Sequence, residues 1–429
     1  MPGIIEFPTV VKQAVTEFGA VFANEPERVH FAEYLTGLLV AERKTVNGIS
    51  REFAETTDQS CLNRWITEVK WDVNALNEER LAWLQRQPDT RYARSGVIPI
   101  DNVLIGHDGE LIDDVGWLWD HAENRHVVAH DYLIANYVCP SGKHYALEFR
   151  RFRKREDCEA WRDLLASRPG GLAAAEEAQR ALTVFKDHTV LCCELIDWVV
   201  TREIPGDFTF DSYFTSAAVM NHIHAHARAY VGDLKFNRKL WVGGREIKAS
   251  EFATEIAPEQ RKPLEREGRG GKTQWSFTKT IHLPTVDHAV RLVILWADQH
   301  AAQPIKMLIT NRTIWEVTRV VRVYAKRWTG TETQHRDGKQ HLGMGDCQLR
   351  KREGQTRHMY LVLLLHSLLM AQLHQSRACA WAHTTLTTIG EACRAALRET
   401  LGATIDWVIE RSLHDEWSPH RIKAHLALL

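Results

Sequence analysis

The sequence predicts a mixed α/β fold, in which a mixed sheet with flanking helices is interrupted by a β-rich insertion and bounded by helical regions. Three observations predict this fold. Apolar residues recur at helical spacing over residues 27–88, strand-like and helical segments alternate over 95–237, and short strand-like runs rich in glycine and charge fill 240–303. The chain has 429 residues, 44% hydrophobic and 25% charged, which is typical of a soluble globular protein with two or three units.

The changes of pattern divide the chain into five predicted units. They are a helical N-terminal region (1–92), the first part of the sheet core (93–239), the β-rich insertion (240–303), the second part of the core (304–376) and a helical C-terminal region (377–429). In the first unit, residues 49–53 and 59–69 have the pattern of two short helices around a turn. This pattern fits either a helix-turn-helix that binds DNA ends or a plain helical bundle.

Individual elements follow from the local pattern. Strands are expected over 96–101, 125–138, 143–149, 207–211, 229–237, 273–283 and 289–296, and helices over 171–200, 215–227 and from 313 onwards. Pro99 is unusual in the first of these strands, because proline donates no ladder hydrogen bond. The apolar run 359–373 is shorter than a membrane span and predicts a buried core helix, so no membrane partner is expected.

Charge and cysteine content limit the compartment and the class of protein. The formal net charge is −1, which excludes a uniformly basic nucleic-acid binder but allows a basic face balanced by an acidic one. The N-terminus has no secretory pattern, and the eight cysteines form no C-x-x-C pair. We therefore expect reduced thiols in a cytoplasmic protein.

Three acidic residues stand where an active site is expected. Asp101 and Asp211 each end a predicted strand, and Glu332 lies on or near a helix beyond the insertion. Side chains at strand ends can converge on one pocket, where three carboxylates would repel one another unless cations bind between them. Such oxygen ligands suit Mg²⁺ or Mn²⁺, and a pair of these ions supports phosphodiester cleavage. Taken singly, each of these acids is more often a solvated surface residue.

The segment that carries Glu332 is more specific. On a helix, Glu332, Arg336 and Lys339 share one face, which suits a metal ion beside a DNA phosphate or, alternatively, a salt-bridged solvated face. Tyr324, Arg327, Glu332 and Lys339 together resemble the Y-R-E-K signature of bacterial insertion-sequence transposases with a DDE active site. The regions around Asp101 and Asp211 also resemble the corresponding regions of that family, over roughly residues 95–375.

The resemblance implies an RNase H-like core and a DNA transposase or endonuclease. It implies that Asp101, Asp211 and Glu332 bind two Mg²⁺ ions, for which Mn²⁺ can substitute, and that Tyr324, Arg327 and Lys339 grip phosphates. It also implies double-stranded DNA as partner, both transposon ends and target, a homodimer on paired ends, and association with the bacterial nucleoid. Trp328, next to the signature, either packs or stacks on a displaced base.

The sequence departs from the family pattern at two places. Four residues separate Arg327 from Glu332 where the family has three, which on an unbroken helix turns the Arg side chain by about 100°. A kink or bulge at Gly330 is one way to absorb the extra residue; otherwise Lys326 becomes a rival for the role of Arg327. The second departure is Asn102, where a further Asp is common in the family.

Basic residues gather in three clusters that are candidates for phosphate contacts. Residues 312–357 hold eleven Lys and Arg against five acids, and two smaller clusters lie over 150–155 and 261–272. Each cluster is either a DNA contact or a solvated charged face. His222, His224 and His226 form an H-x-H-x-H string, but on a helix only the first and last share a face, and the sequence offers no third zinc ligand.

The function that these observations favour is metal-dependent cleavage at transposon ends, followed by strand transfer into target DNA. One alternative is a nuclease with the same core but without strand transfer. Another is a domesticated DNA-binding protein without catalysis, which the altered spacing between Arg327 and Glu332 keeps open.

Overall fold

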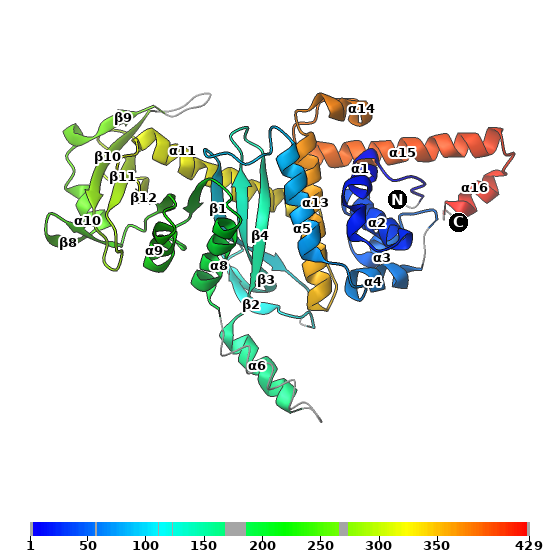
Figure 1. Cartoon of the computed structure of the whole chain (residues 1–429), viewed down its shortest axis with the longest axis horizontal. Coiled ribbons are helices and arrows are strands. Elements are labelled where there is room, and N and C mark those ends of the chain that lie inside the picture. The colour runs from blue at the N-terminus through cyan, green and yellow to red at the C-terminus, as the bar shows by residue number, and fades with distance from the viewer. Residues whose placement is uncertain are drawn as a thin grey trace.

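The computed structural model describes residues 3–55, 58–109, 111–121, 123–167, 186–265 and 273–426. Helices form both ends of the chain and a mixed sheet lies between them (Figure 1). The predicted fold class is thereby confirmed. The expected helix over 171–200 lies partly outside the described residues, and α8 (His188–Thr201) forms its second half.

The N-terminal helices pack with the C-terminal ones into a single helical end of the molecule. They are α1 (Thr9–Phe18), α2 (Glu25–Val40), α3 (Val46–Ser50), α4 (Gln59–Thr67) and α5 (Val73–Arg86), with α13 (Arg352–Gln372), α14 (Cys379–Ala382), α15 (Ile389–Leu413) and α16 (Pro419–His425). The two termini lie near each other (Figure 1), and the hydroxyl of Thr404 donates a hydrogen bond of 2.9 Å to the carbonyl of Gly3.

Among the described residues, ten strands form one mixed sheet. Its strands are β1 (Val97–Gly106), β2 (Gly116–Asp120), β3 (Arg125–Val138), β4 (His144–Phe152), β5 (Asp207–Phe210), β6 (Tyr230–Asp233), β9 (Lys262–Leu264), β10 (Gln274–Ile281), β11 (Val290–Trp296) and β12 (Lys306–Thr310). The central order is β4-β3-β1-β5-β6, in which β1, β5 and β6 are parallel and β3 is antiparallel to both β1 and β4. This mixed order agrees with the expected RNase H-like core.

The β-rich segment extends this sheet. β12 pairs antiparallel with β6, and β11, β10 and β9 follow outwards, while β7 (Lys239–Val242) and β8 (Arg245–Lys248) form a separate hairpin before α10 (Ala249–Thr254). Hydrogen bonding between β11 and β12 therefore attaches the segment to the core. The five domain boundaries remain a prediction.

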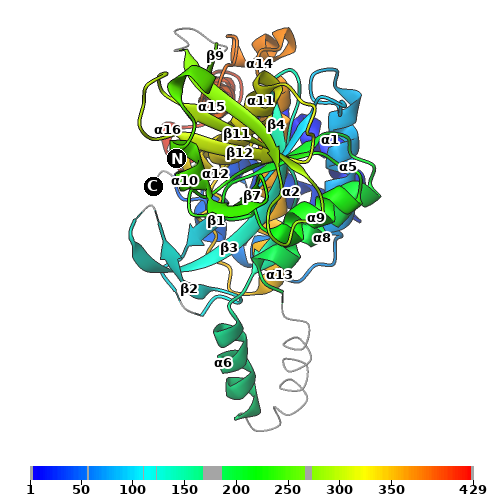
Figure 2. The same cartoon turned by 90° about the vertical axis from the view of Figure 1, so that its left-hand side faces the viewer.

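Helices cover both faces of the central strands (Figure 2). α8 contacts β3, β4 and α9 (Ala217–Ala225), whereas α11 (Val317–Trp328) contacts β1 and β5 from the other face. α6 (Arg155–Ala166) projects away from the body of the molecule. The run 359–373 falls in α13, which is almost wholly buried as predicted, and no described helix is long and apolar enough to span a membrane.

Pro99 lies inside β1 in the centre of the sheet, which is unusual for proline. The β1–β3 pairing runs from Val97 opposite Val138 directly to Ile100 opposite Ala135, so the ladder is interrupted at the proline. On the other side Pro99 stands opposite Thr209 of β5. β1 therefore accommodates the missing N–H donor of Pro99 because it does not pair with β3 at that residue.

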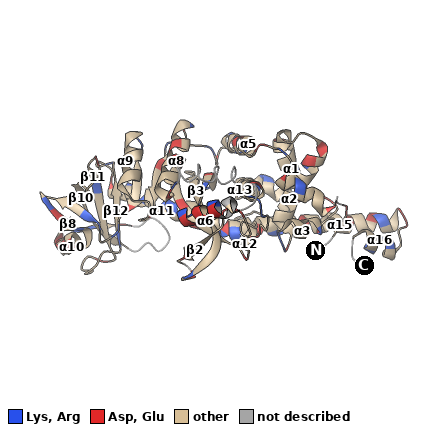
Figure 3. Ribbon diagram, turned by 90° about the horizontal axis from the view of Figure 1, so that it is seen from below, with Lys and Arg blue, Asp and Glu red and all other residues tan. Residues whose placement is uncertain are grey.

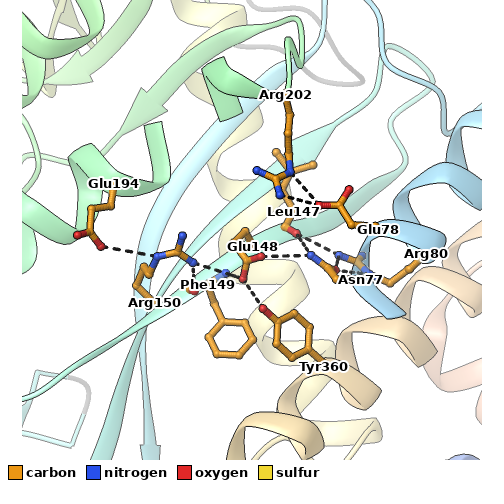
Figure 4. A network of polar contacts seen from close by, with 10 residues as sticks. All are labelled: Asn77, Glu78, Arg80, Leu147, Glu148, Phe149, Arg150, Glu194, Arg202 and Tyr360. Atoms are coloured by element: carbon orange, nitrogen blue, oxygen red, sulfur yellow. Dashed lines mark hydrogen bonds and ion pairs between the residues drawn. The ribbon is translucent and has the colours of Figure 1, made fainter. Parts of the chain in front are cut away.

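A buried polar network joins the N-terminal helices to the sheet and to α13 (Figure 4). Arg80 of α5 is 1% exposed and donates hydrogen bonds to Asn77, to the carbonyl of Leu147 and to Ser367 of α13. Glu148 of β4 accepts a 2.7 Å hydrogen bond from the hydroxyl of Tyr360. Because buried polar groups are stable only when they are paired, this network fixes the register of α5 and α13 against β4.

The segment between β1 and β2 contains a buried carboxylate. The side chain of Asp114 is 4% exposed and contacts Arg151 at 2.9 Å, Arg153 at 3.0 Å and Arg352 at 2.7 Å. These three guanidinium groups lower the pKa of Asp114 below its ordinary value against the opposing effect of burial. Two arginines of the 150–155 cluster are thus paired with Asp114, an environment that differs from both the DNA contact and the solvated face considered for this cluster.

We expect Asp114→Asn to lower the free energy of unfolding by about 3 kcal/mol, because Arg151, itself 9% exposed, loses its buried counter-charge. Asn tolerates the left-handed backbone of this position (φ 67°), so the change tests the charge alone. Denaturant unfolding at neutral pH measures the difference. Because the folded-state pKa of Asp114 is depressed, the difference should shrink as the pH falls below about 4. The exposed control Asp108→Asn should change stability by less than about 0.5 kcal/mol.

Candidate active site

The two predicted aspartates lie side by side at the same edge of parallel strands. The β1–β5 register pairs Ile98 with Phe208 and Pro99 with Thr209, so two residues further along Asp101 stands next to Asp211. β5 ends at Phe210, which leaves Asp211 as the first residue of the following turn. There its Oδ1 accepts hydrogen bonds from the backbone N–H groups of Tyr213 (2.9 Å) and Phe214 (3.3 Å). The turn thereby fixes the orientation of this carboxylate.

Glu332 reaches the same edge through an irregular helix. α11 is followed by a π-helical turn, Thr329–Thr333, and then by α12 (Gln334–His341). A π turn closes with i to i+5 hydrogen bonds, so residues five apart fall on one side of it. Arg327 and Glu332 are five apart and do meet, with 3.8 Å between Nη1 and Oε1. The extra residue of the sequence is therefore absorbed as a bulge.

Gly330 makes this bulge possible. It is buried, and a Cβ atom at this position would lie 2.4 Å from Cγ of Pro99 and 2.6 Å from Cγ2 of Val138. The hydroxyl of Thr331, which is also buried, donates a 2.9 Å hydrogen bond to the carbonyl of Arg327. The helix thus presses directly on β1 beside Asp101, and only glycine fits at the closest point.

Arg327 lies between two of the three acids. Its Nη1 is 2.7 Å from Oδ2 of Asp101 and 3.8 Å from Oε1 of Glu332, so the two carboxylates are separated by at most the sum of these distances. Burial lowers the pKa of Lys326, the rival for this role. The carboxylate that opposes this shift is Asp207, which is not one of the three acids. The geometry assigns Arg327 and not Lys326 to the acidic site.

The electrostatics of the site show strong crowding of negative charge. The side chain of Asp101 is 13% exposed, and its burial, followed by the charge of Asp211, raises its pKa to about 7; Glu332 contributes in the same direction. Arg327 and the backbone N–H of Asn102 oppose the shift without cancelling it. The protein alone therefore does not offset the cost of a charged, buried Asp101 carboxylate.

The residues present suit divalent cations. Carboxylate oxygens are the ligands that Mg²⁺ and Mn²⁺ prefer, and a guanidinium already occupies a position between two of the carboxylates. The three side chains do not place one oxygen each within 4.8 Å of the others, so ligation requires them to close further. Glu332, whose side chain is 46% exposed, is the member with most room to move.

Of the other predicted contact residues, three are exposed and one is half-buried. Trp328 is 62% exposed, and the side chain of Arg336 is 57% exposed. Lys339 is exposed, although partial burial of its ammonium group lowers its pKa, while the charges of Asp120, Glu123 and Glu332 act in the opposite direction. Tyr324 is half-buried, and its hydroxyl lies 3.4 Å from Asp233 rather than at the acids.

The third basic cluster is only partly described, because residues 266–272 lie outside the described residues. Within the part that is described, Arg261 is 7% exposed, lies over the ring of Trp296, and donates to the carbonyls of Gln299 and Ala301. Arg261 therefore serves the packing of the β-rich segment. The basic residues of the molecule are distributed over several elements (Figure 3).

A hydrogen-bonded chain beside the acids was not predicted from the sequence. Asn102 donates to Oδ1 of buried Asp131 (3.1 Å), whose Oδ2 bonds His188 (2.7 Å), and His188 bonds the hydroxyl of Tyr213 (3.2 Å). The chain connects the residue after Asp101 with the turn that holds Asp211. Its members come from β1, β3, α8 and the turn after β5, and no sequence spacing relates them.

The histidine string has a third partner that the sequence did not reveal. His222 and His226 lie on one side of α9, and the Nε2 atoms of both bond Oδ1 of Asp197 on α8, at 2.7 Å and 3.0 Å. Asp197 is thus a potential third ligand in space, one that the sequence spacing alone did not offer. The arrangement is an exposed ion-pair cluster whose nitrogens are already hydrogen-bonded.

Comparison with known proteins gives one family. Residues 17–291 match the sequence profile of the DDE superfamily endonucleases, which covers well over half of the chain and includes Asp101 and Asp211. Glu332 lies beyond the matched residues. No curated protein matches the chain.

Proposed function

Since the chain belongs to the DDE superfamily endonucleases, a family of metal-dependent nucleases that act on DNA, we propose that it is a DNA transposase. It cuts phosphodiester bonds at transposon ends and joins the freed 3′ ends to target DNA. The observation that supports this proposal is the placement of Asp101, Asp211 and Glu332 at one sheet edge, where burial, followed by the charge of Asp211, raises the pKa of Asp101 to about 7.

The three acids have distinct roles in this proposal. Asp101 and Asp211 hold two Mg²⁺ ions jointly, and Glu332 completes the ligand set of one of them. The ions supply activation of a water or 3′-hydroxyl and stabilisation of the leaving oxygen. The backbone N–H groups that bond Asp211 hold its carboxylate in place, so less ordering is needed when substrate arrives.

Arg327 changes partner in this proposal. In the protein alone it pairs with Asp101, but an arginine is also well suited to bind a phosphate in a bidentate manner. If the acids held divalent cations, these would compete with Arg327 for Asp101, and the guanidinium would then be free to bind the scissile phosphate. Arg336 and Lys339 on α12, together with exposed Trp328, extend the contact surface along the DNA, and two copies of the chain are expected on paired ends.

Strand transfer is the step that separates a transposase from a simple nuclease. We expect the purified protein, incubated with a labelled transposon-end duplex, Mg²⁺ and a supercoiled plasmid, to yield joined end–plasmid products. A precleaved end with a free 3′-hydroxyl serves as the matched substrate, because it bypasses cleavage. Cut ends without any joined product, even from the precleaved duplex, would favour the nuclease; binding without cutting would favour the inactive DNA-binding protein.

Lys339→Ala should weaken binding of the transposon end and flatten its salt dependence, because one phosphate contact is lost. The slope of log K against log salt should become less steep by about 1. Fluorescence anisotropy at several salt concentrations measures this slope. Lys423→Ala on α16 is the matched control, since it removes an equally exposed charge far from the acids in the sequence. A slope equal to that of the wild type would remove Lys339 from the phosphate contacts.

A further inference from the structure

A second group of potential metal ligands lies inside the protein. His144 at the start of β4, Asp337 on α12 and His366 on α13 each offer one ligand atom, and these atoms all lie within 4.8 Å of one another. The two imidazole ring centroids are 5.7 Å apart. The three residues come from three separate elements, so their meeting is a product of the tertiary fold.

The imidazole groups of this cluster lack hydrogen-bond partners. His366 is 1% exposed and His144 is 6% exposed. Neither ring nitrogen of His366, nor Nε2 of His144, has a partner among the described residues. Buried polar atoms without partners are rare in native proteins, because each keeps the cost of its lost hydration. These nitrogens therefore require a further group that the described side chains and backbone do not supply.

The protonation states favour coordination of a cation. Burial lowers the pKa of His144 to about 4 and lowers the pKa of His366 well below its ordinary value, so both rings are neutral at pH 7 and offer a lone pair. The charge of Arg336 also lowers the pKa of His144, and the charges of Arg80 and His335 also lower the pKa of His366. Nδ1 of His144 faces the carbonyl of Gly142 at 3.5 Å, which directs Nε2 towards the cluster.

The carboxylate of Asp337 can also accept a further positively charged partner. Burial raises the pKa of Asp337. The carboxylate forms a long ion pair of 3.6 Å with Arg336 of its own helix, and His341 contributes a weaker favourable charge. A divalent cation would compensate this charge. The cluster of Asp197, His222 and His226 is different, because its carboxylate already forms hydrogen bonds with both histidines. These hydrogen bonds alone explain the geometry of that cluster.

We propose that His144, Asp337 and His366 bind a Zn²⁺ ion. Two imidazole nitrogens and one carboxylate oxygen form a common ligand set for zinc, with bonds of about 2.0–2.2 Å and a fourth position for water. Ligand atoms of a tetrahedral site lie about 3.4 Å apart, so atoms within 4.8 Å close onto the ion by small side-chain rotations. The ion ties β4 and α13 to α12, the helix that begins directly after the turn carrying Glu332.

Zinc content of the full-length protein tests this proposal. The test uses the Asp101→Asn/Asp211→Asn double variant as background, so that the acidic edge does not contribute. We expect about one Zn²⁺ per chain after loading and dialysis, measured by mass spectrometry of the metal, and a Co²⁺-substituted form with visible d–d absorption. Asp337→Asn and His366→Leu should weaken Zn²⁺ affinity at least tenfold, whereas His222→Gln in the exposed cluster should leave it unchanged.

Thermal unfolding gives a second readout. Zn²⁺ should raise the melting temperature of the background protein by several degrees, but not that of the Asp337→Asn or His366→Leu variant. The proposal is overturned if the background binds no zinc, if both cluster variants keep wild-type affinity, or if His222→Gln abolishes binding. Without zinc binding, a higher melting temperature of His366→Leu would identify His366 as merely an unpaired core residue. If His366→Leu does not fold, Asp337→Asn decides the question.

Discussion

Asp211→Asn should abolish DNA cleavage and strand transfer while the protein still binds transposon ends. The amide keeps an Oδ1 acceptor for the backbone N–H groups of Tyr213 and Phe214, so the turn persists and only the charge is lost. Metal ions contribute several kcal/mol of transition-state stabilisation, and each 1.4 kcal/mol corresponds to about tenfold in rate. We therefore expect a loss of about a thousandfold or more in the cleavage rate, measured on a labelled end duplex.

The same substitution separates a catalytic role from a structural one. Removing the charge of Asp211 relieves one cause of the raised pKa of Asp101, so the variant should unfold at a temperature equal to or above that of the wild type. Asp406→Asn on α15 removes an exposed carboxylate elsewhere and should leave cleavage and melting unchanged. A variant at Asp211 that cuts DNA at the wild-type rate would show that this residue does not hold the metal ions.

The positions of the two aspartates follow from the sequence because each depends on a short, local pattern. A buried strand followed by a carboxylate predicts a side chain at a sheet edge, and two such strands, if parallel and adjacent, bring both acids together. The structure has this arrangement for Asp101 and Asp211. The buried helix α13 was predictable for a similar reason, since its apolar run has no other favourable environment.

The contacts made across large sequence distances were not predictable. The pairing of β6 with β12, which joins the two parts of the core on either side of the β-rich segment, links residues about 75 positions apart and leaves no periodic signal in either strand. Asp114 lies in a stretch, residues 101–124, that contains no Lys or Arg, so the sequence around it indicates no cationic partner. Its arginine partners are supplied by β4 and α13, and only the fold brings them to it.

Arg327 shows how one residue type fits two environments. Its sequence context predicts a phosphate contact, whereas in the protein without DNA it pairs with Asp101 and lies near Glu332. Both behaviours follow from the same property, a permanently charged planar group that binds carboxylates and phosphates equally well. Sequence alone identifies the group but not which anion it contacts in a given state.

Gly330→Ala should reduce cleavage by about a hundredfold or more, although residue 330 contacts no substrate in our proposal. The new Cβ would lie 2.4 Å from Cγ of Pro99 and 2.6 Å from Cγ2 of Val138, and neither atom belongs to a flexible side-chain end. The π-helical turn must therefore move away from β1 and carry Glu332 with it. Misplacement of a catalytic group by about 1 Å can reduce a rate by about a hundredfold. Cleavage assays on the labelled end duplex measure this loss.

The matched control for Gly330→Ala is Gly402→Ala in α15, where an added Cβ meets no atom within 4 Å and alanine favours the helix. This control should keep full activity and gain a little stability. Overpacking at residue 330 should also lower the free energy of unfolding by about 1–3 kcal/mol. End binding measured by anisotropy should change little, because the exposed faces of α11 and α12 remain available for contact. If Gly330→Ala cleaves DNA normally, the position of Glu332 does not depend on the close approach of the π-helical turn to β1, and its assignment as a metal ligand loses its main geometric support.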